Sequence, residues 1–195
     1  MKPDVLTRWL GAARRERVLR VLLSDYVLNG ASCAFGMFVV SAIVHLLFGA
    51  EAAANATVGV IAALAPDLVG PRRGKLVHLV VAPLIGVPLF LAVQLLRGHP
   101  VGLGLFLVPA TFLAFLGMAW GKRGAPVAIG VMLVMLFSMS TPLAASPGQA
   151  LVRTFYCGLG CALYVVYALV AHTVLNARYR TQLTADLLLA VAALL

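Results

Sequence analysis

The sequence predicts an all-α integral membrane protein with six transmembrane helices preceded by an amphipathic helix, and three observations lead to this fold class. Apolar residues make up 63% of the 195 residues and charged residues only 11%, whereas a soluble domain carries about 25% charged residues. Runs without Asp, Glu, Lys or Arg recur at about the length of a membrane span. Basic residues gather at alternate connectors between these runs, as the positive-inside rule requires.

Residues 1–24 carry apolar positions at roughly helical spacing, among them Val5, Trp9, Val18 and Leu22, with arginines between them. This pattern is typical of a basic amphipathic helix that lies on the anionic inner leaflet. A solvated cytoplasmic leader is the alternative interpretation. The segment has no apolar core long enough for a cleavable signal peptide, so we expect the first span to be an uncleaved anchor.

Six apolar runs follow, and each is expected to form one transmembrane helix. In lipid, backbone N–H and C=O groups need partners within their own segment, which a helix supplies. At a rise of about 1.5 Å per residue, about 20 residues cross a hydrocarbon layer of about 30 Å. Glycine and proline separate the runs and turn the chain. The six runs cover residues 26–50, 52–69, 76–96, 101–120, 125–143 and 154–177.

The orientation follows from the positions of the basic residues. With the N-terminus in the cytoplasm, 13 of the 15 Lys and Arg residues fall on the cytoplasmic side, and only Arg97 and Arg153 fall outside. Such an excess sets the orientation of multi-pass proteins. We therefore expect a protein of the inner (plasma) membrane. Its expected parts are a cytoplasmic amphipathic helix (1–24), a six-helix transmembrane domain (25–178) and the start of a cytoplasmic helix, expected to be truncated (179–195).

Three features of the chain occur in a recognisable order. The second run leads into Ala65-Pro66-Asp67-Leu68-Val69-Gly70-Pro71-Arg72-Arg73, the fourth ends in Trp120-Gly121-Lys122-Arg123, and the tyrosine-bearing sixth ends in Asn176-Ala177-Arg178-Tyr179-Arg180. Together they resemble the transmembrane half of the fusaric acid resistance and aromatic acid exporter superfamily, which is related to the aluminium-activated malate transporters. The chain departs from the family at residues 52–57, where many members carry a tryptophan motif.

The resemblance implies export or conduction of small organic anions, often aromatic carboxylates, by an oligomer or together with a second transmembrane half. Asp67 could gate an inner vestibule by pairing with nearby basic residues, or it could lie in a solvated turn whose charges only fix topology. The pair Lys122 and Arg123 could form a basic inner mouth or only anchor the helix end. The substrate-path candidates are Asp67, Arg72, Arg73, Lys75, Gln94, Lys122, Arg123 and Tyr164.

Gln94 is a candidate because it lies on the third run, whose Pro83 and Pro88 are expected to kink the helix, and transporters place broken helices at substrate sites. A packing kink is the alternative. Tyr164 joins other hydroxyl residues of the fifth and sixth runs that could face an anion or simply hydrogen-bond between helices. These other residues are Ser138, Ser140, Thr141, Tyr156 and Tyr167.

Other classes of function find little support in the sequence. The four histidines and three cysteines show no metal-ligand spacing or disulfide framework, so we expect no metal and no cofactor. No catalytic constellation is visible, and we expect a protein that is not an enzyme. The net charge of +9 is spread over short connectors rather than one face, which argues against nucleic acid. Besides transport, the open alternative is a non-transporting membrane assembly or scaffold protein.

Overall fold

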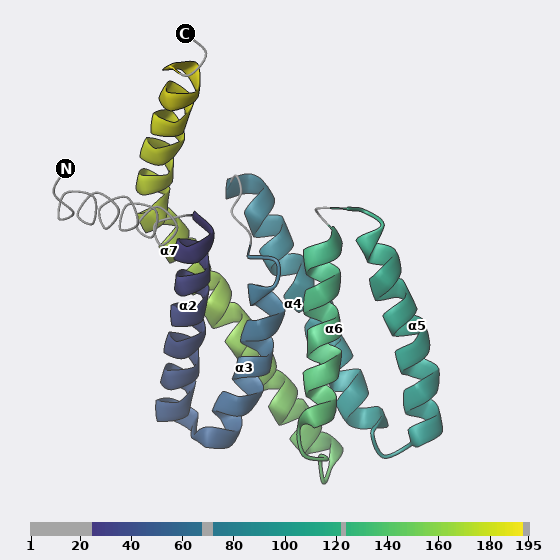
Figure 1. Ribbon diagram of the computed structural model, residues 1–195. Helices are drawn as coiled ribbons and strands as arrows, with labels where there is room; N and C mark the ends of the chain where they lie inside the picture. Colours follow the sequence, from purple (N-terminus) through teal and green to yellow (C-terminus); the bar gives the residue numbers. More distant parts are fainter. Residues whose placement is uncertain (1–24, 68–71, 122–123, 193–195) are drawn as a thin grey trace, which may run out of the picture.

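The computed structural model describes residues 25–67, 72–121 and 124–192, with side chains described within 27–67, 79–121 and 124–173. The described residues are all-helical, and their helices run up and down beside one another (Figure 1). The amphipathic helix expected over 1–24 lies outside the described residues. The helices are α2 (Asp25–Phe48), α3 (Ala50–Leu64), α4 (Arg72–Leu96), α5 (Pro100–Met118), α6 (Gly124–Ser140) and α7 (Pro147–Ala192).

Each of the six helices overlaps one of the six apolar runs. By length and composition, four of them can cross a membrane, namely α2, α4, α5 and α7. The other two are shorter, with 15 residues in α3 and 17 in α6. The chain is therefore a multi-pass membrane protein, and full crossing of the bilayer by α3 and α6 stays a prediction.

The short helix α3 lies inside the bundle, where it packs against α2, α4, α6 and α7. Its 15 residues reach only about 22 Å, but a helix enclosed by protein need not match the hydrocarbon thickness. A single residue, Gly49, joins it to α2 with a φ of 87°, which a side chain would strain. Helix α3 ends at Leu64, shortly before Pro66 and earlier than the expected end at residue 69.

The contact between α3 and α7 is made backbone to backbone. A methyl group added at Gly160 would lie 2.0 Å from the carbonyl oxygen of Ala56, and one at Gly59 would lie 1.9 Å from that of Cys157. The thiol of Cys161 donates a hydrogen bond of 3.1 Å to the carbonyl of Gly59. Only glycine lets two helices approach this closely, and small residues serve this purpose between helices in membranes.

Two expectations about helix ends and interiors need correction. Helix α7 begins at Pro147 rather than at Thr154. Arg153, which was expected to lie before the helix, is buried within its second turn. Helix α4 starts at Arg72 rather than at Leu76, and Pro83 and Pro88 do not interrupt it, whereas the kink expected at these prolines stays a prediction. Proline inside a membrane helix is tolerated when neighbouring groups satisfy the freed carbonyls.

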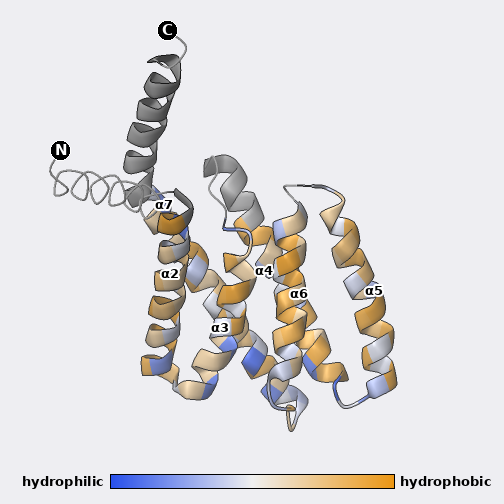
Figure 2. Cartoon of the chain, in the orientation of Figure 1, coloured by the Kyte–Doolittle hydropathy of each residue, from blue (hydrophilic) through white to orange (hydrophobic). Residues whose placement is uncertain are grey.

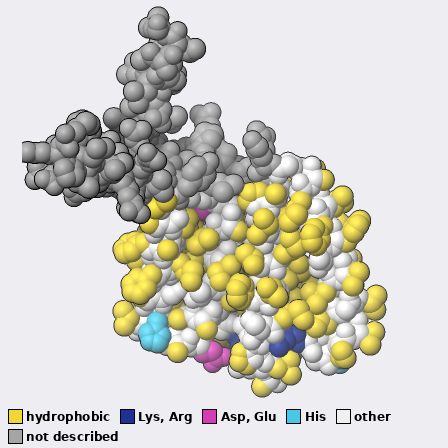
Figure 3. All heavy atoms as spheres, in the orientation of Figure 1, with side chains coloured by type: hydrophobic (Ala, Val, Ile, Leu, Met, Phe, Trp, Pro, Cys, Tyr) yellow, Lys and Arg dark blue, Asp and Glu magenta, His cyan; other side chains and the backbone are white. Residues whose placement is uncertain are grey.

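The outer surface of the bundle is apolar. Hydrophobic residues predominate along the helices (Figure 2), and hydrophobic side chains cover much of the visible described surface (Figure 3). Helix α5 is the extreme case, since Ala114 is its buried residue while Leu105, Phe112 and Phe115 are exposed. Such a surface suits contact with lipid and not with water.

Candidate functional site

Buried and half-buried polar side chains gather at opposite ends of this apolar bundle. The inner cluster, Asn29, Cys33, Asp67 and Tyr164, lies where α2 begins and α3 ends. The outer cluster, Gln94, Arg97, Ser138 and Thr141, lies where α4 and α6 end. The names inner and outer follow the orientation that the basic residues predict. A buried polar group in a membrane is costly unless it is hydrogen-bonded, so both clusters are candidates for function.

The carboxylate of Asp67 is the centre of the inner cluster and is only 7% exposed. The hydroxyl of Tyr164, fully buried on α7, donates a hydrogen bond of 2.9 Å to Asp67 Oδ2. The thiol of Cys33 on α2 donates to the same oxygen at 3.6 Å. Asn29 donates through its amide to the backbone carbonyl of Asp67 at 3.0 Å. Groups from α2 and α7 thus hold the residue that follows α3.

Tyr167, one turn beyond Tyr164, fixes the adjoining part of α7 against α2. Its hydroxyl donates to the carbonyl of Ser32 at 2.9 Å, and it lies 3.2 Å from the hydroxyl of Ser32. Its ring occupies the space beside Gly36, where an added methyl would come within 2.2 Å of a ring carbon. Tyr164 therefore lies on a stretch of α7 that Tyr167 holds against α2 and Cys161 holds against α3.

The outer cluster surrounds the C-terminal end of α6. The amide of Gln94 donates to the carbonyl of Ser138 at 3.1 Å and also reaches the hydroxyl of Thr141. Arg97 donates through Nη1 to the carbonyl of Ser138 at 3.4 Å and to the carbonyl of Thr141. The last carbonyls of a helix lack partners within the helix and carry partial negative charge, which a cation stabilises.

An ion pair closes the outer end of α3 against α7. Arg153 lies 3.0 Å from Glu51, and their side chains are 6% and 67% exposed. Arg153 also donates to the carbonyl of Pro142 in the connection before α7. From the sequence alone, Arg153 counts only as a basic residue on the outer side of the membrane. The sequence does contain a signal for this ion pair. Arg153 is a lone charge among apolar residues, and Glu51 is an acidic residue at the same end of another run.

The structure brings together two of the predicted site residues and separates others. Asp67 and Tyr164 are in direct contact, whereas Gln94 belongs to the cluster at the opposite end. The eight candidates therefore do not form one compact site. The side chains of Arg72, Arg73 and Lys75, and the residues Lys122 and Arg123 altogether, lie outside the described part.

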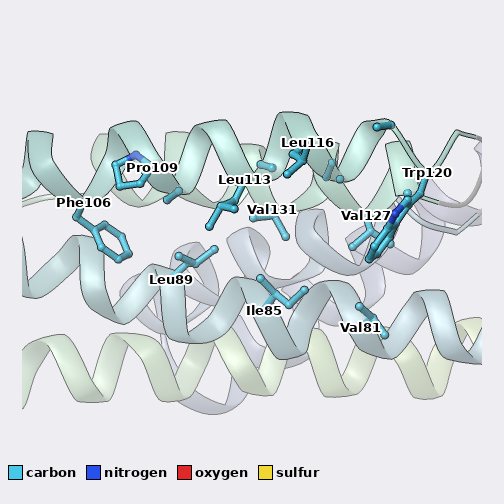
Figure 4. A pocket seen from close by; sticks show the side chains of 16 residues that line it. Val81, Ile85, Leu89, Phe106, Pro109, Leu113, Leu116, Trp120, Val127 and Val131 are labelled. Carbon is cyan, nitrogen blue, oxygen red and sulfur yellow. The ribbon is translucent and has the colours of Figure 1, made fainter.

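A cleft of about 1130 Å³ lies between α4, α5 and α6. It is lined almost wholly by apolar groups, with Phe106 towards one end and Trp120 at the other (Figure 4). Val81, Ile85 and Leu89 of α4 form one wall. None of the side chains of the inner or outer cluster lines it. An apolar ligand would be buried in this cleft, but no charged side chain of the described residues lines it.

The chain matches a known protein family. Residues 84–195, more than half of the chain, match a family described as FUSC-like inner membrane protein yccS. The match includes Lys122-Arg123 and the end of the sixth run, while the Asp67 segment precedes it. Searches among curated proteins and among solved structures found no match.

Proposed function

We propose, from the premise that this chain belongs to the FUSC-like inner membrane protein family, that it exports small organic anions, including aromatic carboxylates. The family match over residues 84–195, in a bundle of apolar helices, is the observation that carries the proposal. That combination indicates a transporter-type membrane protein. The substrate class and the outward direction are the proposed parts.

The inner cluster supports an anionic substrate. Tyr164 and Cys33 present an O–H and an S–H donor to a carboxylate, which in this structure is that of Asp67. An organic carboxylate needs donors of the same kind, because hydrogen bonds to an ionised acceptor are stronger than neutral ones. We propose that Asp67 competes with the substrate for Tyr164 and so closes the site when no substrate is bound.

The charge distribution supports the outward direction. In the predicted orientation, 13 of 15 basic residues face the cytoplasm, where clustered positive charge raises the local concentration of anions. We propose that Arg72, Arg73, Lys75, Lys122 and Arg123 collect the substrate at this end. The path would then run between helix bundles of an oligomer, or between this bundle and a second transmembrane half, without cofactor or catalytic step.

A flux measurement tests the proposal. The purified chain is reconstituted into liposomes, and release of benzoate is compared with release of uncharged benzyl alcohol. Protein-dependent release of benzoate alone is expected. Tyr164→Phe should slow it about tenfold, since one hydrogen bond to a charged group is lost. Tyr156→Phe is the matched control on α7, because the Tyr156 hydroxyl makes no hydrogen bond with the described residues.

Two outcomes would contradict the proposal. Folded wild-type protein that releases no carboxylate would leave the non-transporting assembly function in its place. Equal loss of flux in Tyr164→Phe and Tyr156→Phe would remove the inner cluster from the path. The orientation is tested separately by cysteines introduced at positions 98 and 122, which should react with impermeant reagents from opposite sides of the membrane.

A further inference from the structure

Gln94 has a hydrogen-bond acceptor that the described protein does not use. The residue is only 3% exposed, and its Oε1 is buried without a donor. Its amide orientation is fixed, because Nε2 points at the carbonyl of Ser138, which accepts only a donor. The two hydroxyls beside it cannot help: Ser138 donates to the carbonyl of Phe90, and Thr141 donates to that of Ser138.

Arg97 has donors left over at the same place. Only Nη1 of its guanidinium is engaged by described residues, on the two carbonyls at the end of α6. No carboxylate of the described residues pairs with it, in contrast to Arg153, which pairs with Glu51. Arg97 is half-buried, so its charge is screened less than that of a surface residue.

The two groups are neighbours on one helix face. Gln94 and Arg97 stand three positions apart on and just after α4, a spacing that places their Cβ atoms about 5–6 Å apart. Both side chains also donate hydrogen bonds to the carbonyl of Ser138, so both point towards the C-terminal end of α6. The free edge of Arg97 is half-exposed, whereas Oε1 of Gln94 is enclosed by protein, so a ligand of few atoms that meets both groups must displace side chains at this end of α6.

We propose that Gln94 and Arg97 form an outer-end binding site for a carboxylate with a hydroxyl on the neighbouring carbon. The carboxylate binds the free guanidinium edge of Arg97, and the hydroxyl donates to Gln94 Oε1. A carboxylate without the hydroxyl leaves Oε1 without a donor. A 2-amino acid brings an ammonium next to the Arg97 charge, which repels it. As a release site for exported anions the inference rests on the proposed function, but binding itself does not require transport.

Binding to the purified full chain in nanodiscs tests the site, with mandelate and phenylacetate as probes that differ by the one hydroxyl. Mandelate should bind about tenfold more tightly, the value of one hydrogen bond to a buried acceptor. Gln94→Glu should weaken both probes, because its carboxylate occupies Arg97. Gln149→Glu is the matched control, as Gln149 lies at the same end of the bundle and bonds only within its own turn. It should bind as the wild type does.

Three results would overturn the site: equal binding of the two probes, unchanged binding in Gln94→Glu, or equal weakening in Gln149→Glu. Equal binding would mean that water satisfies Oε1. The thermal unfolding of each unliganded variant shows whether a loss of binding is only a loss of fold, and Arg97→Lys, which keeps the charge, provides a second variant. Binding without flux in the wild type would refute export and leave the site standing, whereas flux without this binding would do the reverse.

Discussion

Replacing Gly160 by alanine is expected to force α3 and α7 apart at their closest contact. The new methyl would lie 2.0 Å from the carbonyl oxygen of Ala56 and 2.8 Å from its Cα, where an ordinary contact needs at least 3.4 Å. The helices must therefore separate by more than an ångström, since both atoms belong to the backbone and cannot rotate away. The hydrogen bond between Cys161 and Gly59 lengthens with them.

The expected loss of stability follows from two opposing terms. Overpacking costs about 3 kcal/mol at its upper end, and alanine in place of glycine in a helix returns about 1 kcal/mol. The net loss is about 2 kcal/mol for Gly160→Ala. Gly104→Ala on α5 is the matched control, because no atom lies within 4 Å of the added methyl, and it should gain up to about 1 kcal/mol.

Unfolding in mixed micelles by titration with sodium dodecyl sulfate measures both variants. Opposite shifts of the midpoint, with Gly160→Ala unfolding at lower detergent fraction and Gly104→Ala at equal or higher fraction, support the close contact. If the two variants shift alike, helix propensity alone governs the outcome, and the backbone contact between α3 and α7 is refuted.

Two further predictions concern buried polar groups and use the same titration. Tyr164→Phe should cost about 1–3 kcal/mol, because it removes a donor from the buried Asp67 carboxylate; no change would show that the carboxylate is satisfied without Tyr164. In the outer ion pair, Glu51→Ala should cost about 3 kcal/mol because it leaves the buried Arg153 charge without its partner. Arg153→Met should cost about 1 kcal/mol or less, since the exposed Glu51 returns to water. The reverse order would mean that the Arg153 charge is solvated.

The helices could be predicted because their cause is local. Lipid requires each segment to satisfy its own backbone, so runs free of charge predict helices within a few residues of α2, α5 and α6. The rule fails where a charge finds a partner from another helix. Arg153 was expected to precede the sixth helix, but its contacts with Glu51 and Pro142 allow α7 to begin at Pro147.

The candidate site was predictable only in part, because its contacts join distant parts of the chain. Asp67 and Tyr164 were each selected for their chemistry, but nothing in the sequence places two residues 97 positions apart at 2.9 Å. Small-residue packing shows the same limit. The sixth run contains several small residues, and nothing in their spacing singles out Gly160, which the structure packs against Ala56.

Helix α7 is uninterrupted from Pro147 to Ala192, changes direction along its length and extends well past the other helices (Figure 1). From its tight crossing at Gly160 to Ala192 the helix is about 48 Å long, measured along its axis. A tilt of about 10° at that pivot would sweep the far tip through about 8 Å, by simple leverage along a helix of this rise per residue. A small rocking movement between α3 and α7 thus becomes a large excursion of the distal end.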